Sequence, residues 1–274
     1  MPNITNSPDE IKFNMAQLKT GVRLHYAEKG KIDGEVIIFL HGYTDSWYSF
    51  STVLSLLSTE YHAYSLSQRG HGESEKPDHY SMSDFAADVK AFMNELGIEK
   101  ASIVGHSMGS FIAQKVAIDY ADRVKRLVLI GSAPSAINNQ SLLEFQEFVG
   151  TLEGPIDRKL VYEFQSSTLL NPVPDEFLEN VVSESMKVPV RVWQKALAGL
   201  SKVDHKDQLH QINAPTLIVW GDHDDFFTQE EQETLTNRIT NATFKLYHDV
   251  GHGIHWEKPQ ETVNDIEKFM QSEK

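Results

Sequence analysis

A serine between two glycines is the first feature of this sequence that could do chemistry. Gly105 to Gly109 read G-H-S-M-G, directly after the apolar run A-S-I-V and before a helix-like segment, Met108 to Tyr120. In a sharp turn from a strand into a helix a serine hydroxyl stands clear of the sheet, and side chains at the flanking glycines would collide with backbone. A bare G-x-S-x-G is common by chance, but with these flanks it predicts Ser107 as a nucleophile.

A serine nucleophile needs a histidine to take its proton and an acid to orient that histidine. In a strand–turn–helix of this kind the chain order is serine, acid, histidine. Three aspartates, Asp222, Asp224 and Asp225, follow the apolar run T-L-I-V-W-G, and His252 follows the run T-F-K-L-Y. The sequence therefore predicts His252 as the base and an aspartate of this cluster as the acid.

A metal site is the rival use of the histidines near the C-terminus. His248, His252 and His255 have the spacing i, i+4 and i+7, which would align them on a helix. Gly251 and Gly253 interrupt any such helix, and no H-E-x-x-H motif occurs. The sequence therefore predicts no metal.

The elements that must position these residues can be read from the apolar runs. Residues 11–18 and 22–28 have the pattern of a hairpin. Short apolar runs then alternate with helical stretches, which is typical of a parallel sheet covered on both faces; the runs begin at Val36, Tyr61, Ala101, Leu127, Thr216 and Thr243. Between the fourth and fifth apolar runs, no strand-like run occurs for some seventy residues. This stretch has the pattern of helices separated by G-P, N-P-V-P and V-P. We expect residues 136–205 to be a helical cap inserted in a core of residues 1–135 and 206–274.

Charge and composition limit the classes of partner that this protein could bind. The chain has 274 residues, no cysteine, and 25 Lys and Arg against 39 Asp and Glu, a formal net charge of −14. Nucleic-acid binders concentrate positive charge, so this balance argues against nucleic acid. No apolar run approaches the roughly 18 residues that span a bilayer, and the polar first ten residues do not resemble a signal peptide. We expect a cytoplasmic protein without membrane association or disulfides.

Together the motifs resemble the α/β-hydrolase superfamily, in its esterase and epoxide-hydrolase-like branch with a helical cap. The similarity runs over nearly the whole chain, through H-G-Y-T-D, R-G-H-G-E-S, G-H-S-M-G, G-D-H-D and G-H-G-I-H-W-E-K-P. It implies an α/β fold, with a mostly parallel central sheet, helices on both faces and a cap. It also implies Ser107 as nucleophile, Asp224 as acid and His252 as base. The backbone amides of Tyr43 and Met108 would form the oxyanion hole, and the resemblance implies no cofactor.

Departures from the family pattern narrow the activity. Epoxide hydrolases and haloalkane dehalogenases of this branch have aspartate where this chain has Ser107. Carbon–carbon hydrolases of the fold usually carry H-G-G-G-P-G and a tryptophan after the histidine, where this chain has H-G-Y-T-D and Gly253. We therefore expect a carboxylic ester hydrolase that cleaves a small, fairly apolar ester or lactone through an acyl-enzyme. A carbon–carbon bond hydrolase, a cofactor-free perhydrolase and a weakly hydrolytic ligand sensor are the alternatives.

Substrate binding is expected over Ser107, where aromatic side chains of the insertion would line an apolar pocket. The candidate binding residues are Tyr43, His106, Trp193 and Arg191, the last as an anchor for an anion. His106 also lies in a turn motif, as do His41 and His71, where histidines are commonly structural. The partner is expected to be a small molecule, and the protein a monomer or homodimer.

Overall fold

The computed structural model describes residues 7–272, so the first six residues of the polar N-terminal segment lie outside the described residues. Eight strands form one sheet in the order β1-β2-β4-β3-β5-β6-β7-β8. Their bounds are β1 Lys12–Gln17, β2 Arg23–Gly30, β3 Glu35–Leu40, β4 Tyr61–Leu66, β5 Ala101–His106, β6 Val124–Ile130, β7 Thr216–Gly221 and β8 Ala242–Tyr247.

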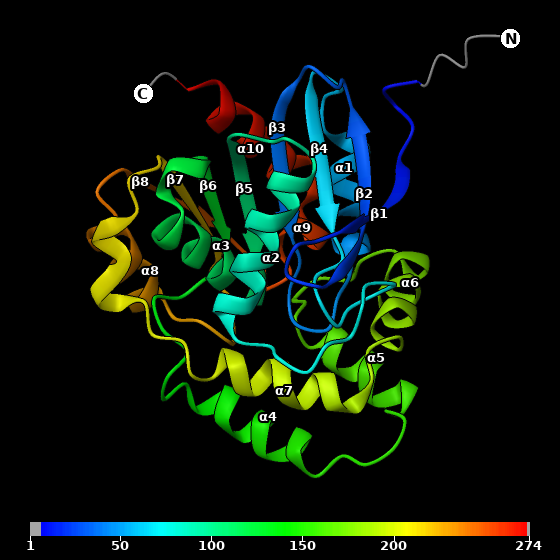
Figure 1. The fold of residues 1–274 in the computed structure, drawn as a ribbon. Coiled ribbons are helices and arrows are strands. Elements are labelled where there is room, and N and C mark those ends of the chain that lie inside the picture. Colours follow the sequence, from blue (N-terminus) through cyan, green and yellow to red (C-terminus); the bar gives the residue numbers. More distant parts are fainter. Residues whose placement is uncertain (1–6, 273–274) are drawn as a thin grey trace, which may run out of the picture.

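The sheet is mostly parallel, as the apolar runs predict. β1 and β2 form the expected hairpin, and β2 pairs antiparallel with β4. The strands from β4 to β8 in the sheet order pair in parallel, so their carboxyl ends meet at one edge. The ends of the described chain lie at the opposite edge (Figure 1). Loops that follow parallel strands are therefore gathered on a single side of the molecule.

One strand begins earlier than the apolar pattern indicates. β6 starts at Val124, three residues before the expected Leu127, because two basic residues interrupt the apolar run. The side chains of Lys125 and Arg126 both reach Glu35 on the neighbouring part of the sheet, with nitrogen–oxygen distances of 2.7 and 3.4 Å. These ion pairs with Glu35 compensate the charges of Lys125 and Arg126, so the two basic residues can be part of the strand.

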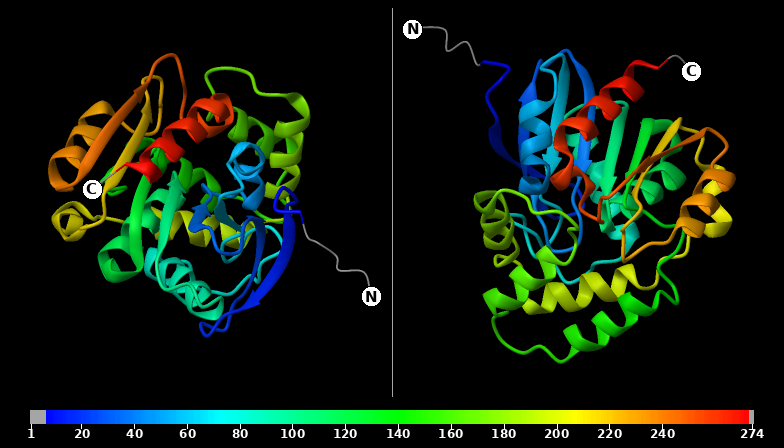
Figure 2. Two further views of the ribbon diagram at one scale, coloured as in Figure 1. Left: turned by 90° about the horizontal axis from the view of Figure 1, so that it is seen from above. Right: turned by 180° about the vertical axis from the view of Figure 1, so that it is seen from behind.

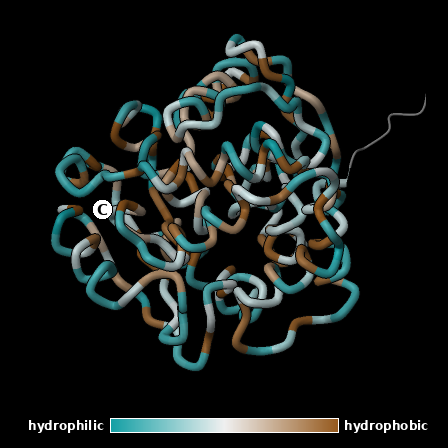
Figure 3. The backbone as a smooth tube through the Cα atoms, turned by 90° about the horizontal axis from the view of Figure 1, so that it is seen from below, coloured by the Kyte–Doolittle hydropathy of each residue, from teal (hydrophilic) through white to brown (hydrophobic). Residues whose placement is uncertain are grey.

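Helices cover both faces of the sheet (Figure 2). The helices α2 (Met82–Glu95), α3 (Met108–Asp119) and α8 (Gln229–Arg238) contribute to the largest of three apolar clusters in the described part of the chain. On the other face lie α1 (Ser51–Leu56) and α10 (Pro259–Gln271), with the second cluster beneath them. Hydrophobic residues concentrate on the inner stretches of the chain, whereas the outer loops are mostly hydrophilic (Figure 3).

Four helices run between β6 and β7 and lie across the carboxyl edge of the sheet (Figure 1). They are α4 (Gln140–Gly150), α5 (Arg158–Ser166), α6 (Asp175–Ser185) and α7 (Val190–Leu200), and the proline-containing segments of the sequence separate them. The two ends of the insertion are held together by an isolated antiparallel β-bridge between Ser135 and Asp204. The Ala136 amide donates to the Val203 carbonyl at 2.9 Å. The insertion is thereby fixed to the sheet at its base.

Among residues 7–272, no helix has the length and apolar character that crossing a membrane requires.

Candidate active site

Ser107 lies in the turn between β5 and α3, in a strained backbone conformation. Its φ and ψ are 50° and −120°, a region that residues other than glycine rarely adopt. The close crossing of α3 over the sheet requires the two flanking glycines. A Cβ on Gly105 would lie 2.3 Å from the Gly109 carbonyl oxygen, and one on Gly109 would lie 2.1 Å from that of Leu40. The turn is thus held in place by backbone packing, as expected for a serine presented to a cavity.

His252 follows β8 and is oriented by a buried aspartate. Its Nδ1–H donates to Oδ2 of Asp224 at 2.7 Å, and the two side chains are 4% and 0% exposed. The other carboxylate oxygen, Oδ1, accepts from the backbone amides of Phe226 and Phe227 at 2.8 and 3.1 Å. Because the proton is on Nδ1, the Nε2 atom of the neutral ring is free to accept one.

The other candidate acids and metal ligands are placed elsewhere. Asp222 accepts from Nδ1 of the exposed His248 and from the Asp249 amide, which makes it a loop-stabilising residue. Asp225 is exposed. His255 stacks on a phenylalanine inside the core, and its Nε2 is 3.1 Å from a serine hydroxyl. Of the residues in the described range, no three His, Asp or Glu side chains are grouped as a metal would require.

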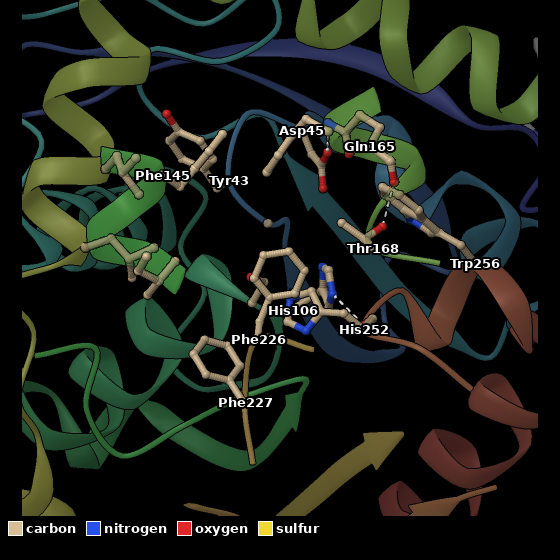
Figure 4. Close-up of a pocket in the computed structure, with 16 residues that line it drawn as sticks. Tyr43, Asp45, His106, Phe145, Gln165, Thr168, Phe226, Phe227, His252 and Trp256 are labelled. Carbon is tan, nitrogen blue, oxygen red and sulfur yellow. Dashed lines mark hydrogen bonds between the residues drawn. The ribbon is translucent and has the colours of Figure 1, made fainter. Parts of the chain in front are cut away.

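Ser107 and His252 line the same cavity, which lies between the carboxyl edge of the sheet and the inserted helices (Figure 4). Most of its wall is aromatic or aliphatic. The lining residues are Gly42, Tyr43, Asp45, His106, Ser107, Leu142, Phe145, Phe164, Gln165, Thr168, Leu197, Leu200, Phe226, Phe227, His252 and Trp256. Such a wall suits a substrate with a mainly apolar body.

Two backbone amides near the serine have no acceptor within residues 7–272. They belong to Tyr43, in the loop after β3, and to Met108, the first residue of α3. Unsatisfied amides at a helix start carry partial positive charge and readily bind an anionic oxygen. These are the two amides for which the sequence predicts an oxyanion hole, and that role stays a prediction.

The four expected substrate-binding residues fall into two groups. Tyr43 and His106 line the cavity. Trp193 does not: it is fully buried behind Tyr43, with ring centroids 5.4 Å apart, and its carbonyl accepts from the tyrosine hydroxyl at 2.7 Å. It supports the wall of the pocket rather than forming it.

Arg191 is also placed away from the cavity, which corrects its expected position as an anchor for an anion. Its guanidinium lies on the exposed side of α7 and donates to the carbonyls of Pro77 and Lys76 at 3.1 and 2.6 Å. It also approaches Asp78 at 3.6 Å. The guanidinium N–H groups of Arg191 thus connect α7 to the loop before α2 and are not directed at a ligand in the cavity.

His41 and His71 do hold turns, as the sequence motifs suggest. His41 Nδ1–H donates to the Gly42 carbonyl at 2.7 Å, while its Nε2 accepts from the Gln68 amide at 3.0 Å. His71 Nδ1–H donates to the Arg69 carbonyl at 2.7 Å. Burial lowers the pKa of His71 to about 4, which keeps that ring neutral.

Several pocket residues carry no signal that sequence reasoning could have used. Asp45 belongs to the H-G-Y-T-D motif but has no partner nearby in the sequence; in the fold it accepts from Gln165 of α5 at 2.9 Å. Burial raises the pKa of Asp45 to about 7, against hydrogen bonds from Gln165 and Ser49 that lower it. Phe226 and Phe227 also reach the cavity from the loop after β7, and Trp256 reaches it from the short helix α9 (Ile254–Glu257). Only the fold brings these residues beside Ser107.

Comparisons with known proteins agree with this architecture. The family model described as alpha/beta hydrolase fold matches residues 35–259. The chain is 25% identical to "Epoxide hydrolase 4" of Mus musculus, covering 93% of this chain and 77% of that protein. It is 28% identical to a "2-hydroxy-6-oxononadienedioate/2-hydroxy-6-oxononatrienedioate hydrolase" of Paraburkholderia phymatum, covering 89% of each. Among solved structures, an esterase from Exiguobacterium antarcticum superposes with a TM-score of 0.87 at 20% identity, covering 95% of this chain and all of the other.

Proposed function

The chain belongs to the alpha/beta hydrolase fold family and is a hydrolase, and we propose that it is a serine hydrolase of small, fairly apolar carboxylic esters or lactones. One observation carries the proposal. Ser107 has a positive φ in the turn between β5 and α3 and shares a cavity with His252. The Nδ1 atom of His252 is hydrogen-bonded to the buried Asp224.

The proposed mechanism is acyl transfer through Ser107. His252 Nε2 takes the hydroxyl proton as Oγ attacks the carbonyl carbon, and Asp224 stabilises the imidazolium that results. The amides of Tyr43 and Met108 donate to the oxyanion of the tetrahedral intermediate. On collapse the alcohol leaves with the proton from His252. Water, deprotonated by the same ring, then attacks the acyl-enzyme, and the carboxylic acid and free serine are released.

The nucleophile argues against epoxide opening, although an epoxide hydrolase is among the relatives. Attack by a serine hydroxyl on an epoxide carbon would join enzyme and substrate through an ether. An ether has no carbonyl for water to attack, so the enzyme would be consumed after one event. Attack on an ester or lactone gives an acyl-enzyme that water can hydrolyse. Ser107 therefore favours a carbonyl substrate.

The lining of the cavity argues against a dianionic substrate such as the dioate in the name of the Paraburkholderia relative. Among residues 7–272 no Lys or Arg lines the cavity, and Asp45 is a potential negative charge within it. A substrate carboxylate would enter an apolar space without a positive partner, at a cost of several kcal/mol. Neutral esters and lactones avoid that cost.

The organisation of the chain fits this use. We propose that residues 136–205 form a cap over the cavity, and that residues 1–135 and 206–274 form the catalytic core. Six pocket residues come from α4, α5 and α7, two from each helix, among them Leu142, Phe164 and Leu197. The proposal includes no cofactor, a cytoplasmic location, and a monomer or homodimer; the absence of cysteine supports a reducing compartment.

A substrate panel with a nucleophile variant tests the proposal. The wild type should turn over aryl esters and lactones of graded size, and Ser107→Ala should lose about 10⁴-fold or more of kcat/KM. Ser183→Ala, at an exposed serine of α6, serves as the matched control and should retain full activity. Near-normal turnover by Ser107→Ala would contradict the proposal.

The same assay separates the alternatives. A carbon–carbon hydrolase would prefer a vinylogous diketone to an aryl acetate, and a perhydrolase would form peracetate from acetate and peroxide. A ligand sensor would release one equivalent of alcohol and then stop. Sustained release of alcohol from esters, in preference to both other reactions, is the result that we expect.

A further inference from the structure

Two acceptor groups in the mostly apolar cavity have no role in acyl transfer. They are the carboxyl group of Asp45 and the Nδ1 atom of His106, and both residues line the cavity with Ser107. Buried polar atoms cost free energy unless they are paired, so an unpaired one facing a ligand space requires an explanation.

The His106 ring presents a bare acceptor. Its Nε2–H donates to the His252 carbonyl at 3.1 Å, so Nδ1 carries no proton in the neutral ring. Burial, together with the neighbouring His255 and His252, holds the pKa of His106 well below its usual range. The residue is 2% exposed, and Nδ1 has no hydrogen-bond partner within residues 7–272. This ring is therefore neutral and lacks a donor.

Asp45 lies beside it. The carboxyl group is held by Gln165 Nε2 on Oδ1 at 2.9 Å and by Ser49 Oγ on Oδ2 at 3.2 Å, and the residue is 3% exposed. Asp45 Oδ2 and His106 Nδ1 both lie close to Gly42. A Cβ atom placed on Gly42 would be 3.1 Å from Asp45 Oδ2 and 3.0 Å from His106 Nδ1. Glycine leaves open the space between the two acceptors.

Figure 4 shows how this polar pair is placed against the rest of the pocket. Asp45 and Gln165 lie together at one end, the rings of Phe226 and Phe227 lie at the other, and His106 lies between them beside His252. The two ends would therefore contact different parts of a bound molecule. The apolar end suits a hydrocarbon group, and the polar end suits a hydrogen-bond donor.

We propose that Asp45 and His106 form a subsite for a substrate hydroxyl group, so that the preferred substrates are hydroxylated esters or lactones rather than plain alkyl ones. This inference rests on the proposed function. It deepens that function by giving one wall of the cavity a recognition role.

A hydroxyl group matches both acceptors better than other donors do. It can donate to His106 Nδ1, which only accepts. At the same time it can accept from a protonated Asp45, a form that the pKa of about 7 keeps populated at neutral pH, whereas beside an ionised Asp45 its single proton can serve only one of the two acceptors. An ammonium group requires a full counter-charge, which this carboxyl does not supply throughout that range. A site that pairs a substrate hydroxyl discriminates strongly against analogues that lack it.

The test compares size-matched substrates at the wild-type enzyme. The hydroxylated substrates are the phenyl esters of 3-hydroxybutanoate and 2-hydroxybutanoate. They are compared with three other phenyl esters: the plain butanoate, the 3-methoxybutanoate, whose ether oxygen accepts a hydrogen bond but cannot donate one, and the 3-aminobutanoate. We expect kcat/KM for a hydroxy ester to exceed that for the plain and methoxy esters by about 10- to 100-fold. Equal efficiencies, or a preference for the amino ester, would overturn the inference.

The Asp45→Leu variant assigns the preference to this wall. Leucine is close to aspartate in size but offers neither a donor nor an acceptor, so the hydroxy preference should fall by about tenfold or more, mainly through KM. Asp265→Leu, at a partly buried carboxylate that accepts from Tyr247 outside the cavity, is the matched control. A preference that survives in Asp45→Leu, or that falls equally in both variants, would overturn the inference.

Two readouts keep the outcomes distinct. If Asp45→Leu fails to fold, the wild-type substrate comparison still decides. A wild type that hydrolyses all the esters alike while an organophosphonate labels Ser107 overturns the subsite and leaves the proposed function standing. A wild type that neither hydrolyses esters nor takes the label overturns both.

Discussion

Replacing Asp224 by asparagine should reverse the proton arrangement of His252, and the structure shows why. Oδ1 of Asp224 accepts from two backbone amides, at 2.8 and 3.1 Å. In Asp224→Asn the side-chain oxygen must keep that position, because an NH₂ group there would face two other donors. The NH₂ group therefore points at His252 Nδ1, which then has to accept. The ring proton is forced onto Nε2, so the ring cannot take the proton from Ser107.

The expected loss follows from that tautomer change. In serine proteases the corresponding substitution costs about 10⁴-fold in kcat, which is about 5 kcal/mol of barrier. The fold should be little affected, since the two amide hydrogen bonds remain and no charge is left unpaired. Steady-state hydrolysis of an aryl ester measures the rate, and urea unfolding measures the stability.

Neighbouring aspartates provide the controls. Asp222→Asn and Asp225→Asn change the same loop without touching His252 and should each lose less than about tenfold. A loss under tenfold in Asp224→Asn, or an equal loss in either neighbour, would refute the tautomer argument. A large loss of stability in Asp224→Asn would mean that the activity change reports unfolding instead.

Three further predictions concern packing, pH and metals. Gly109→Ala should lower the free energy of unfolding by about 1–3 kcal/mol or more, because its Cβ would lie 2.1 Å from the Leu40 carbonyl oxygen. Gly150→Ala, with no atom within 4 Å, should be neutral or stabilising in urea titrations. The pKa of Asp45 is raised to about 7 from its ordinary 3.8, so the folded state binds this proton more tightly than the unfolded chain does. Its contribution to stability is complete below about pH 4 and is lost as pH rises through 7. The wild-type free energy of unfolding relative to Asp45→Asn should therefore fall by about 2–3 kcal/mol between pH 5 and pH 8, and a flat or rising difference would contradict the argument. Prolonged dialysis against EDTA should leave kcat unchanged; a loss restored by Zn²⁺ would reassign the chemistry.

Local sequence patterns predict the sheet well because the inner parallel strands are buried on both faces, whereas β8, at the edge, is largely exposed. The run 36–40 is apolar throughout, and the run 101–105 is apolar apart from Ser102; they lie within β3 and β5. Motifs that begin where such a strand ends must lie at one edge, which is how Ser107 and His252 come to share a cavity although 145 positions separate them. The α/β fold is confirmed on these grounds.

Side-chain direction within the insertion is not encoded locally. Trp193 and Arg191 are two residues apart on α7, yet one turns into the core behind Tyr43 and the other pairs with carbonyl groups near Pro77. Helical periodicity predicts an apolar face but does not say whether a given ring meets the core or the ligand space. Asp45 shows the same limit, because its burial depends on Gln165 from a helix 120 positions away.

Labelling of the nucleophile tests the central claim most directly. The wild type is treated with an organophosphonate, digested and mapped by mass spectrometry, with Ser107→Ala as the reference. The proposed triad predicts one adduct per chain, located on Ser107, with loss of ester turnover in parallel. An adduct on another residue, or an active enzyme whose Ser107 stays unmodified, would contradict the account.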